Sequence, residues 1–524
     1  MEKIRKIWEN IKIQPDIWLF FLFLFSFSLT LRKVILYFPF QGTFNEYAGI
    51  YVYISDILLG VTIVLWLFTI LYNTKDYSSM YRLWITWLKH KLSPTSRRFL
   101  KSLYLSLPLL LVIWSFLSIL WSDNHTIAFF RSAKLLEFYL LYLFIIFRFV
   151  PRMFHVEHST SNKTSTTLNC STWNIFSLII ILVGFIQSAI GIIQVLIQRS
   201  IGLSVLGESM IAPNIPGVAK IVFHLPRLAV FGEAGGERYI RAYGLFPHPN
   251  ILGGYLLLSI ILTLLYLKLF HPPRLAETRR REAGVEQFEF LRGGTILVGY
   301  VRLLQVILYA VLALQVFALI LSFSKSAILG LFVALLYIYV PRGTSEVVTG
   351  WNNSRLRIAI LSILIIISLG LLANQDLDRN LEQSFQERLT YLNVSRGTIL
   401  ANPVLGVGIG QFVWNMQRYA LVPLEVWQFQ PVHNVFLLIW SELGIIGLGL
   451  FIYWLYKVFT AKPILSNDNT YLSIDISLRY FKGILLGFIF IMLFDHYFWD
   501  IQQGSLMLWI ILGFIAGMKL YKDS

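Results

Sequence analysis

Long apolar runs recur throughout this sequence, and this feature restricts its fold more than any other. A bilayer core about 30 Å thick needs about 20 apolar residues per spanning helix. We count twelve such runs, near residues 17–38, 50–72, 103–121, 127–147, 174–196, 250–269, 303–322, 326–340, 357–374, 434–456, 480–497 and 503–519. The pattern predicts an all-α, polytopic membrane protein with about 12 transmembrane helices, and residues 1–524 are expected to form a single membrane domain.

The composition excludes a water-soluble enzyme. Hydrophobic residues make up 56% of the chain and charged residues 14%, whereas an ordinary soluble domain is about 25% charged. The net charge of +16 does not indicate nucleic-acid binding, because Lys and Arg fall mainly in the short segments that flank the apolar runs. Cys170 is the only cysteine, so no intrachain disulfide and no cysteine metal cluster can form.

The basic residues also predict the orientation of the chain. Four precede the first run, seven lie between residues 74 and 101, and five lie between residues 270 and 298. The short intervening loops near residues 39–49, 122–126 and 498–502 carry none. By the positive-inside rule, both termini and the insert at residues 270–298 are predicted to be cytoplasmic.

Two predicted outer loops stand apart by their length, at residues 197–249 and 375–433. Long ordered loops are usually functional. In the first loop, Arg238 and Arg241 precede a Pro-His-Pro-Asn turn. Because the prolines prevent a helical start, the arginines should lie at the membrane surface. Each is either an anchor to lipid headgroups or a phosphate-binding group.

The second loop holds Arg388, Arg396, a glycine-rich turn over residues 406–410 and His433. No strand precedes the glycines, so they indicate a sharp turn and not a dinucleotide fingerprint. A lone histidine such as His433 usually has no chemical role. Glu442, two turns inside the tenth predicted helix, is either functional, as ionisable groups within a membrane usually are, or a hydrogen-bonding group between helices.

The sequence has no paired carboxylates in a glycosidase-like context, no zinc-protease motif, no Walker sequence and no serine nucleophile elbow. The outer loops offer arginine and histidine without a set of metal ligands. Arginine binds phosphate oxygens bidentately, and histidine titrates near neutrality. Together they indicate a phosphate-linked substrate and a proton transfer.

Several segments strengthen this interpretation by their order: ISDILLG, RAYGLFPHPN, SFSKSAILGLF, ERLTYLN followed by ANPVLGVGIGQF, and HNVFLLIWSELGIIGLG. Each is degenerate alone. In this order, over nearly the whole chain, they resemble the O-antigen ligase and O-antigen polymerase superfamily. These are membrane glycosyltransferases that use polyprenyl-diphosphate-linked glycans.

The resemblance implies a catalytic set of Arg241, Arg388 and His433. Arg388 lies fifteen residues before Pro403, the spacing expected of the family's second arginine, whereas Arg396 lies seven before it. Arg388 is therefore preferred. Further substrate-binding candidates are Arg238, Lys325, Arg396, Asn434 and Glu442.

The resemblance also implies the reaction and its setting. An acceptor hydroxyl would attack the anomeric carbon of the glycan with inversion, and polyprenyl diphosphate would leave, with no metal and no cofactor. The expected partners are a lipid-linked glycan donor, a glycolipid or glycan acceptor, and membrane lipid. The expected location is the bacterial inner membrane, with the active site on the periplasmic side, in cell-surface polysaccharide biosynthesis.

Two alternatives stay open. The acceptor separates a ligase, a polymerase and a protein glycosyltransferase, and the sequence does not choose among them. A secondary transporter of a small anion would also have about twelve helices and outward-facing arginines. Against a transporter, no internal repeat is evident, and the ionisable residues concentrate in the outer loops.

Overall fold

The computed structural model describes residues 14–72, 96–153, 171–222, 238–269, 288–340, 377–461 and 469–522, and within them the chain is mostly helical. The main helices are α2 (Pro15–Ser26), α3 (Ile54–Tyr72), α5 (Ser96–Leu117), α6 (His125–Phe144), α8 (Ser171–Ile197), α9 (Pro249–Leu269), α10 (Phe288–Leu321), α11 (Lys325–Tyr339), α13 (Leu377–Ala401), α14 (Phe412–Tyr419), α15 (Val435–Phe459), α16 (Asn469–Met492) and α18 (Gln502–Lys522). Two short helices also occur, α7 (Val150–Met153) and α17 (Tyr497–Asp500).

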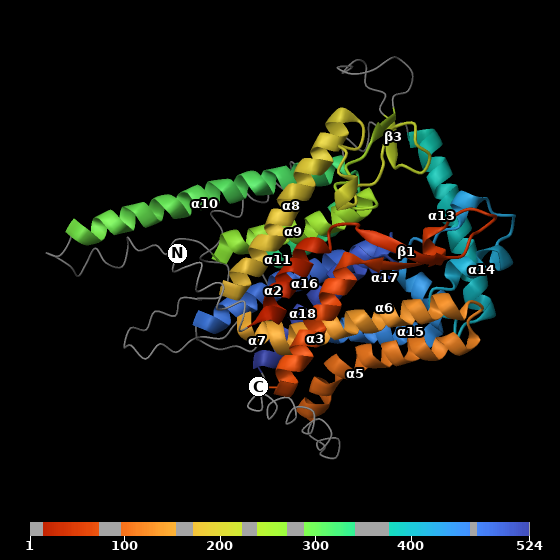
Figure 1. Cartoon of the computed structure of the whole chain (residues 1–524), viewed down its shortest axis with the longest axis horizontal. Coiled ribbons are helices and arrows are strands. Elements are labelled where there is room, and N and C mark those ends of the chain that lie inside the picture. Colours follow the sequence, from red (N-terminus) through yellow and green to blue (C-terminus); the bar gives the residue numbers. More distant parts are fainter. Residues whose placement is uncertain are drawn as a thin grey trace.

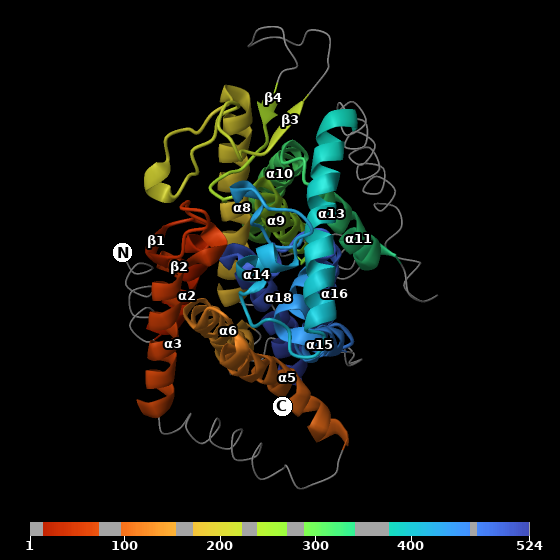
Figure 2. The same ribbon diagram turned by 90° about the vertical axis from the view of Figure 1, so that its right-hand side faces the viewer.

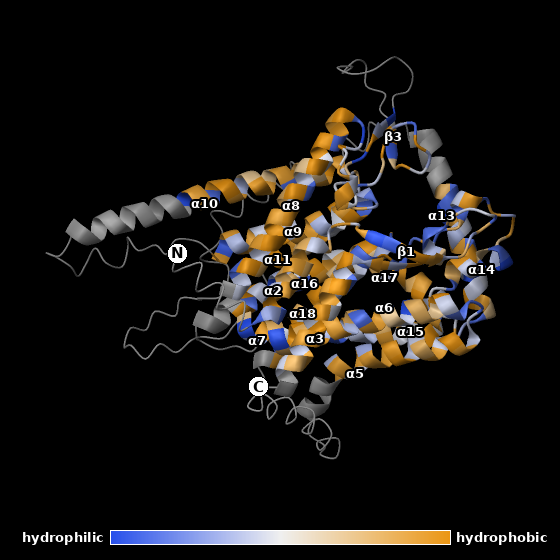
Figure 3. Cartoon of the chain, viewed as in Figure 1, coloured by the Kyte–Doolittle hydropathy of each residue, from blue (hydrophilic) through white to orange (hydrophobic). Residues whose placement is uncertain are grey.

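Six of the described helices are long and apolar enough to cross a membrane. Their spans are Leu103–Trp121, Thr172–Ile197, Pro249–Leu269, Arg302–Leu321, Val435–Phe459 and Gln502–Leu520, and α2, α3 and α11 contribute shorter apolar segments. Hydrophobic residues, coloured orange, dominate these helices in Figure 3. The chain is thus a mainly helical, multi-pass membrane protein. The predicted span at 357–374 lies outside the described residues.

The predicted first span, residues 17–38, is wrong in its second half. Helix α2 ends at Ser26, and strand β1 (Arg32–Tyr37) pairs antiparallel with β2 (Gly49–Tyr53). Neighbouring β-branched residues favour a strand here, and the backbone of β1 finds its hydrogen-bond partners in β2. A second two-stranded sheet joins β3 (Lys220–Val222) to β4 (Arg238–Ile240). The fold is therefore not strictly all-α.

The eleventh predicted span, 480–497, is also wrong at its C-terminal end. Helix α16 stops at Met492, and the chain turns before α17 begins at Tyr497. Asp495 and His496 lie in this turn and not within a span. Two ionisable groups are costly inside a bilayer, so the apolar run ends before them.

Helices α9 and α18 form the centre of the bundle. In both, 89% of the apolar window is buried, whereas the figure for α10 is 28%. A helix that is apolar all round belongs in the interior. Most helices run roughly horizontally in Figure 1, and β1, α13 and α14 lie toward one end of the bundle, away from α7. Figure 2 looks at that end, where α13 and α14 cross in front of α15, α16 and α18.

The segment predicted as the second long loop contains α13 and α14, joined by the glycine-rich turn. The prediction of a sharp turn is confirmed, because Gly406, Gly408 and Gly410 all have positive φ. The turn packs on a kink in α15 at Gly444, which has φ 67° and ψ −172°. The amides of Val407 and Gly408 donate to the carbonyls of Ser441 and Glu442 there, at 3.0 and 2.8 Å.

A Gly444→Ala change should destabilise the protein by about 3 kcal/mol. Its φ is one that L-residues rarely adopt, and an added Cβ would lie 1.9 Å from the carbonyl oxygen of Val404. The measurement is the thermal unfolding midpoint of the purified protein in detergent. Gly449→Ala is the matched control, since its Cβ meets nothing within 4 Å. Equal midpoints for the two variants would contradict this explanation of the kink.

Candidate active site

Arg241 follows strand β4 and is fixed in place by two neighbouring segments. Its Nε donates to the carbonyl oxygen of Ser322, just after α10, at 2.7 Å. Its Nη2 donates to Oδ1 of Asn250 in α9 at 2.6 Å. Burial lowers the pKa of Arg241 to about 10, although Tyr243 and Asp495 raise it. The guanidinium is therefore still a cation at pH 7, held at the junction of α9 and α10.

Asn250 extends this contact to the turn between α16 and α17. Its Nδ2 donates to Oδ2 of Asp495 at 2.7 Å. Burial opposes ionisation of Asp495. Its pKa is nevertheless lowered, because burial is outweighed by the charges of three histidines, His496, His433 and His248, and by the hydrogen bond from Asn250. A carboxylate thus connects Arg241, through Asn250, to a group of histidines.

His433 lies directly before α15, between two rings. It stacks on Tyr391 with ring centroids 5.5 Å apart and planes 13° apart, and it meets His496 edge-on at 5.2 Å. Burial, then the charges of His496 and Arg388, lower the pKa of His433 to about 4, although Asp495 raises it. Its Nδ1 is buried and has no hydrogen-bond partner among the described residues. At pH 7 this is a neutral imidazole with a free nitrogen.

Lys325 and Arg388 bring further positive charge to the same place. Lys325 is the first residue of α11, and the charges of Arg241 and Arg388 both act on it. Arg388, exposed on α13, also acts on His433. Within the described ranges none of Arg241, Lys325 and Arg388 forms an ion pair with a carboxylate. The charges of three cations from separate segments therefore act on one another, and that of Arg388 acts on His433 as well; such a cluster of positive charge is suited to an anion.

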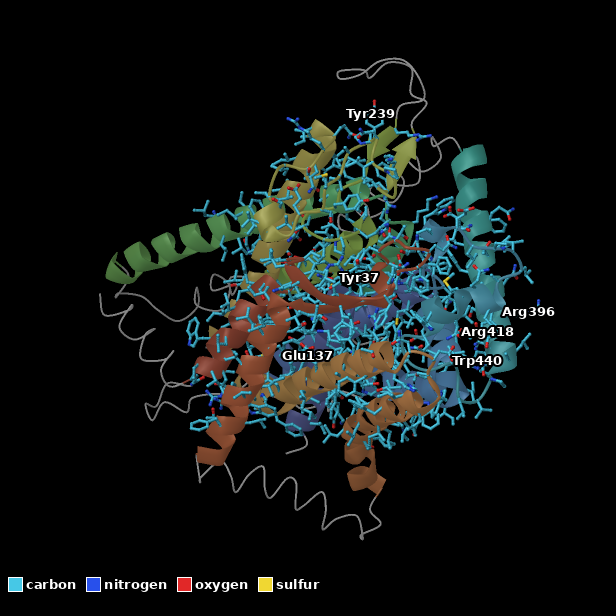
Figure 4. All side chains as sticks on the ribbon, turned by 45° about the vertical axis from the view of Figure 1, so that its right-hand side comes forward. Tyr37, Glu137, Tyr239, Arg396, Arg418 and Trp440 are labelled. Carbon is cyan, nitrogen blue, oxygen red and sulfur yellow. The ribbon has the colours of Figure 1, made fainter. Side chains whose placement is uncertain are left out.

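Two of the predicted substrate-binding arginines lie elsewhere. Arg238 is exposed in β4, where it pairs with Val222 at the edge of the small sheet. Arg396 is exposed on α13, and Figure 4 shows it at the rim of the molecule, pointing outward. The structure thus brings Arg388, and not Arg396, to Lys325 and His433.

Asn434 and Glu442 have structural partners. Asn434 caps α15, because its Oδ1 accepts from the amide of Leu437 at 3.0 Å, and its Nδ2 donates to the Leu493 carbonyl at 3.1 Å. Glu442 is buried and accepts from Nε1 of Trp499 at 3.0 Å. The geometry supports the reading of Glu442 as a hydrogen-bonding group between helices.

Sequence reasoning missed His248, Asn250, Asp495 and His496. Burial, then the charge of Arg241, lower the pKa of His248 to about 3, and its Nδ1 accepts from the amide of Asn250 at 3.2 Å. His496 bonds to Asp500, Nδ1 to Oδ1, at 2.8 Å. Burial alone would lower the pKa of His496, but the charges of Asp500 and Asp495 outweigh burial, so the pKa is raised. The adjacent Asp495 and His496 within a predicted span were the available signal.

The described residues contain no group of three or more His, Cys, Asp or Glu side chains arranged to hold a metal ion. The site is instead a set of cations, a neutral histidine and a buried carboxylate. Such a set can bind a diphosphate, stabilise negative charge that grows on it, and accept a proton nearby.

A comparison with protein families agrees with this chemistry. Residues 309–452 match the family model described as O-antigen ligase. The match runs from within α10 through most of α15 and includes Lys325, Arg388 and His433, whereas Arg241, Asn250 and Asp495 lie outside it. No curated protein sequence matches the chain.

Proposed function

Because this chain belongs to the O-antigen ligase and polymerase superfamily, we propose that it transfers a glycan from a polyprenyl-diphosphate carrier to a hydroxyl group of an acceptor glycan or glycolipid. The observation that carries the proposal is the cluster of positive charge formed by Arg241, Lys325 and Arg388, which acts on the neutral His433 through Arg388. Such a place suits a diphosphate leaving group next to a proton acceptor.

In the proposed reaction, the acceptor oxygen forms a bond to the anomeric carbon while the bond from that carbon to the diphosphate oxygen breaks. The proton of the acceptor hydroxyl passes to an imidazole nitrogen of His433, and polyprenyl diphosphate leaves. Arg241 and Arg388 hold the diphosphate and stabilise its growing negative charge, with Lys325 adding a third cation. Attack opposite to the leaving group inverts the anomeric configuration, and no metal takes part.

Asp495 has a positioning role in this scheme. It holds Asn250, which in turn holds Arg241, at 2.7 and 2.6 Å. Its charge also favours the protonated form of His433. One buried carboxylate therefore orients the cation on the donor side and stabilises the imidazolium that forms on the acceptor side.

Location follows from the lipid carrier. We place the protein in the bacterial inner membrane with the site on the periplasmic side, because the positive-inside rule puts the basic insert in the cytoplasm. The carrier's polyprenyl tail would lie in the bilayer beside the apolar helices while its diphosphate meets the cations.

The decisive experiment is glycan transfer by the full chain in a host strain without its own ligase, and in another without its polymerase. Restored transfer in one host supports the function and separates ligation from polymerisation. For the purified protein, release of polyprenyl diphosphate should be unchanged by EDTA, and a loss of activity restored by a divalent metal would contradict a metal-independent reaction. Anion counterflow in proteoliposomes without any lipid-linked sugar would favour the transporter instead.

The pH profile should report the unusual state of His433. We expect kcat/KM to fall as pH drops through about 4, because the neutral imidazole that accepts the proton is lost there. In Arg388→Ala the residual activity should fall at a higher pH, since one cause that lowers the pKa of His433 is removed. Arg388→Lys keeps the charge and should keep the wild-type profile. A wild-type midpoint near the ordinary histidine value would contradict this assignment.

A further inference from the structure

We propose that a partly open cavity on the His496 side of His433 binds the acceptor sugar as a neutral, hydroxyl-rich ring, an assignment that rests on the proposed glycan transfer. The cavity lies among α6, β2, α15 and α17, and Tyr47, Arg131, Trp499, Asp500 and Gln502 contribute to its lining. None of Arg241, Lys325 and Arg388 lines it. The cavity is thus separate from the group of cations proposed to hold the diphosphate.

The cavity lies beside the two histidines, although neither His433 nor His496 is part of its lining. Asp500, in its wall, accepts a hydrogen bond from Nδ1 of His496 at 2.8 Å. Tyr47, also in the wall, meets the His496 ring edge-on at 5.7 Å. His496 in turn packs on His433. A sugar in this cavity would therefore be separated from His433 by the His496 ring, so the acceptor glycan would extend past His496 to place its reacting hydroxyl beside the proposed proton acceptor.

The charges around the cavity are balanced, in contrast to the cationic region. Arg32 pairs with Glu46 at 3.3 Å, and Lys134 pairs with Asp56 at 2.7 Å and with Glu137 at 2.8 Å. Arg131, the third cation of the lining, donates to the carbonyl oxygens of Asp500 and Tyr47, and the carboxylate of Asp500 lies in the same wall. Cations with carboxylates this near leave little net attraction for a phosphate. The lining thus favours a neutral ligand over a second anion.

Three polar atoms of the lining residues lack hydrogen-bond partners among the described residues. They are Nε of Arg131, Oδ2 of Asp500 and Oε1 of Gln502, all of them buried. Orphaned buried polar atoms are costly and point to a missing partner. Here the orphans are one donor and two acceptors on residues that line one cavity, and the hydroxyl groups of a sugar can both donate and accept.

The size of the cavity agrees with one sugar unit. Its volume is about 70 Å³, enough for about five water molecules. The ring of Trp499 in the wall, with its Nε1 already bonded to Glu442, offers an apolar face beside these polar groups. An aromatic face with bidentate polar groups is a common way to bind a sugar ring.

The test separates acceptor binding from donor chemistry in the purified full chain. The acceptor probe is the water-soluble oligosaccharide released by mild acid from the source cells' own lipid-linked and envelope glycans. The variants are Arg131→Lys, which keeps the charge but loses Nε and the guanidinium fork, and Tyr47→Phe, which removes only a hydroxyl. Arg199→Lys and Tyr453→Phe are the matched controls, because both side chains are exposed.

Binding of the oligosaccharide is measured by equilibrium dialysis. Transfer is measured by the release of polyprenyl diphosphate in the presence of the acceptor, and donor hydrolysis by its release without the acceptor. We expect Arg131→Lys to weaken oligosaccharide binding and raise the half-saturating acceptor concentration by about tenfold, with a smaller change in Tyr47→Phe. The half-saturating donor concentration and the hydrolysis rate without acceptor should change by less than about twofold.

Each contrary result has a distinct meaning. Unchanged oligosaccharide binding in both variants overturns the cavity assignment, even if wild-type transfer is normal. If the two variants raised the half-saturating concentration of the donor and not that of the acceptor, the cavity would hold the donor sugar, and this result too would overturn the assignment. Oligosaccharide binding that depends on Arg131 without any release of polyprenyl diphosphate by the wild type would overturn the proposed function and leave a sugar site.

Discussion

Replacing His433 by alanine should lower kcat by about a hundredfold to ten-thousandfold, the usual effect of losing a general base. The change removes the neutral imidazole that lies between Tyr391 and His496. Donor binding should be largely kept, because the three cations remain. The measurement is release of polyprenyl diphosphate by purified protein at saturating donor and acceptor.

His125→Ala is the matched control for this variant. His125 is the exposed first residue of α6 and belongs to no part of the proposed site. The kcat of the His125→Ala variant should equal that of the wild type. If His433→Ala kept more than about a tenth of wild-type kcat at an equal amount of folded protein, His433 would not be the proton acceptor.

Arg241→Ala should lower kcat by about a hundredfold to a thousandfold, the typical cost of one preorganised charge-stabilising donor. The loss should appear in kcat and not only in KM, because the charge on the diphosphate grows as the glycosidic bond breaks. Arg241→Lys should recover only part of the kcat that is lost in Arg241→Ala. A lysine keeps the charge but cannot bond to both Ser322 and Asn250 as the guanidinium does.

Arg199→Ala is the control for the arginine series, since Arg199 is exposed just after α8. Arg388→Ala should resemble Arg241→Ala, whereas Arg396→Ala, at the outward-pointing position in Figure 4, should resemble the control. A large loss in Arg396→Ala with a small one in Arg388→Ala would reverse the choice between the two arginines of α13.

Local patterns predicted much of the helical core. Apolar runs near 103, 174, 250, 303, 434 and 503 coincide with spans in the structure. The first run misled because apolar composition does not separate helix from strand, and the partner of β1 lies beyond a turn. The second long loop hid α13, because a helix with few apolar residues lacks the periodicity by which helices are found in sequence.

The site was predictable only in part for the same reason. Arg241, Arg388 and His433 could be named because short motifs surround them. Asp495 and His496 could not be joined to them, because their contacts are fixed by how α9, α15 and α16 pack and not by any neighbouring sequence. Asn250 illustrates the limit, since its sequence neighbours indicate only a turn, whereas its amide connects two distant charged groups.

The contact between the glycine-rich turn and the kink at Gly444 acts as a clamp between α13 and α15. The amide of Ile445 also donates to the Pro403 carbonyl at 3.0 Å, so several bonds fasten the end of one helix to the other. Arg388 and His433 are therefore spaced by this clamp and not by the chain that runs between them. Exposed residues 421–423 lie in that chain, and a longer or shorter segment there would leave the spacing of the two side chains intact.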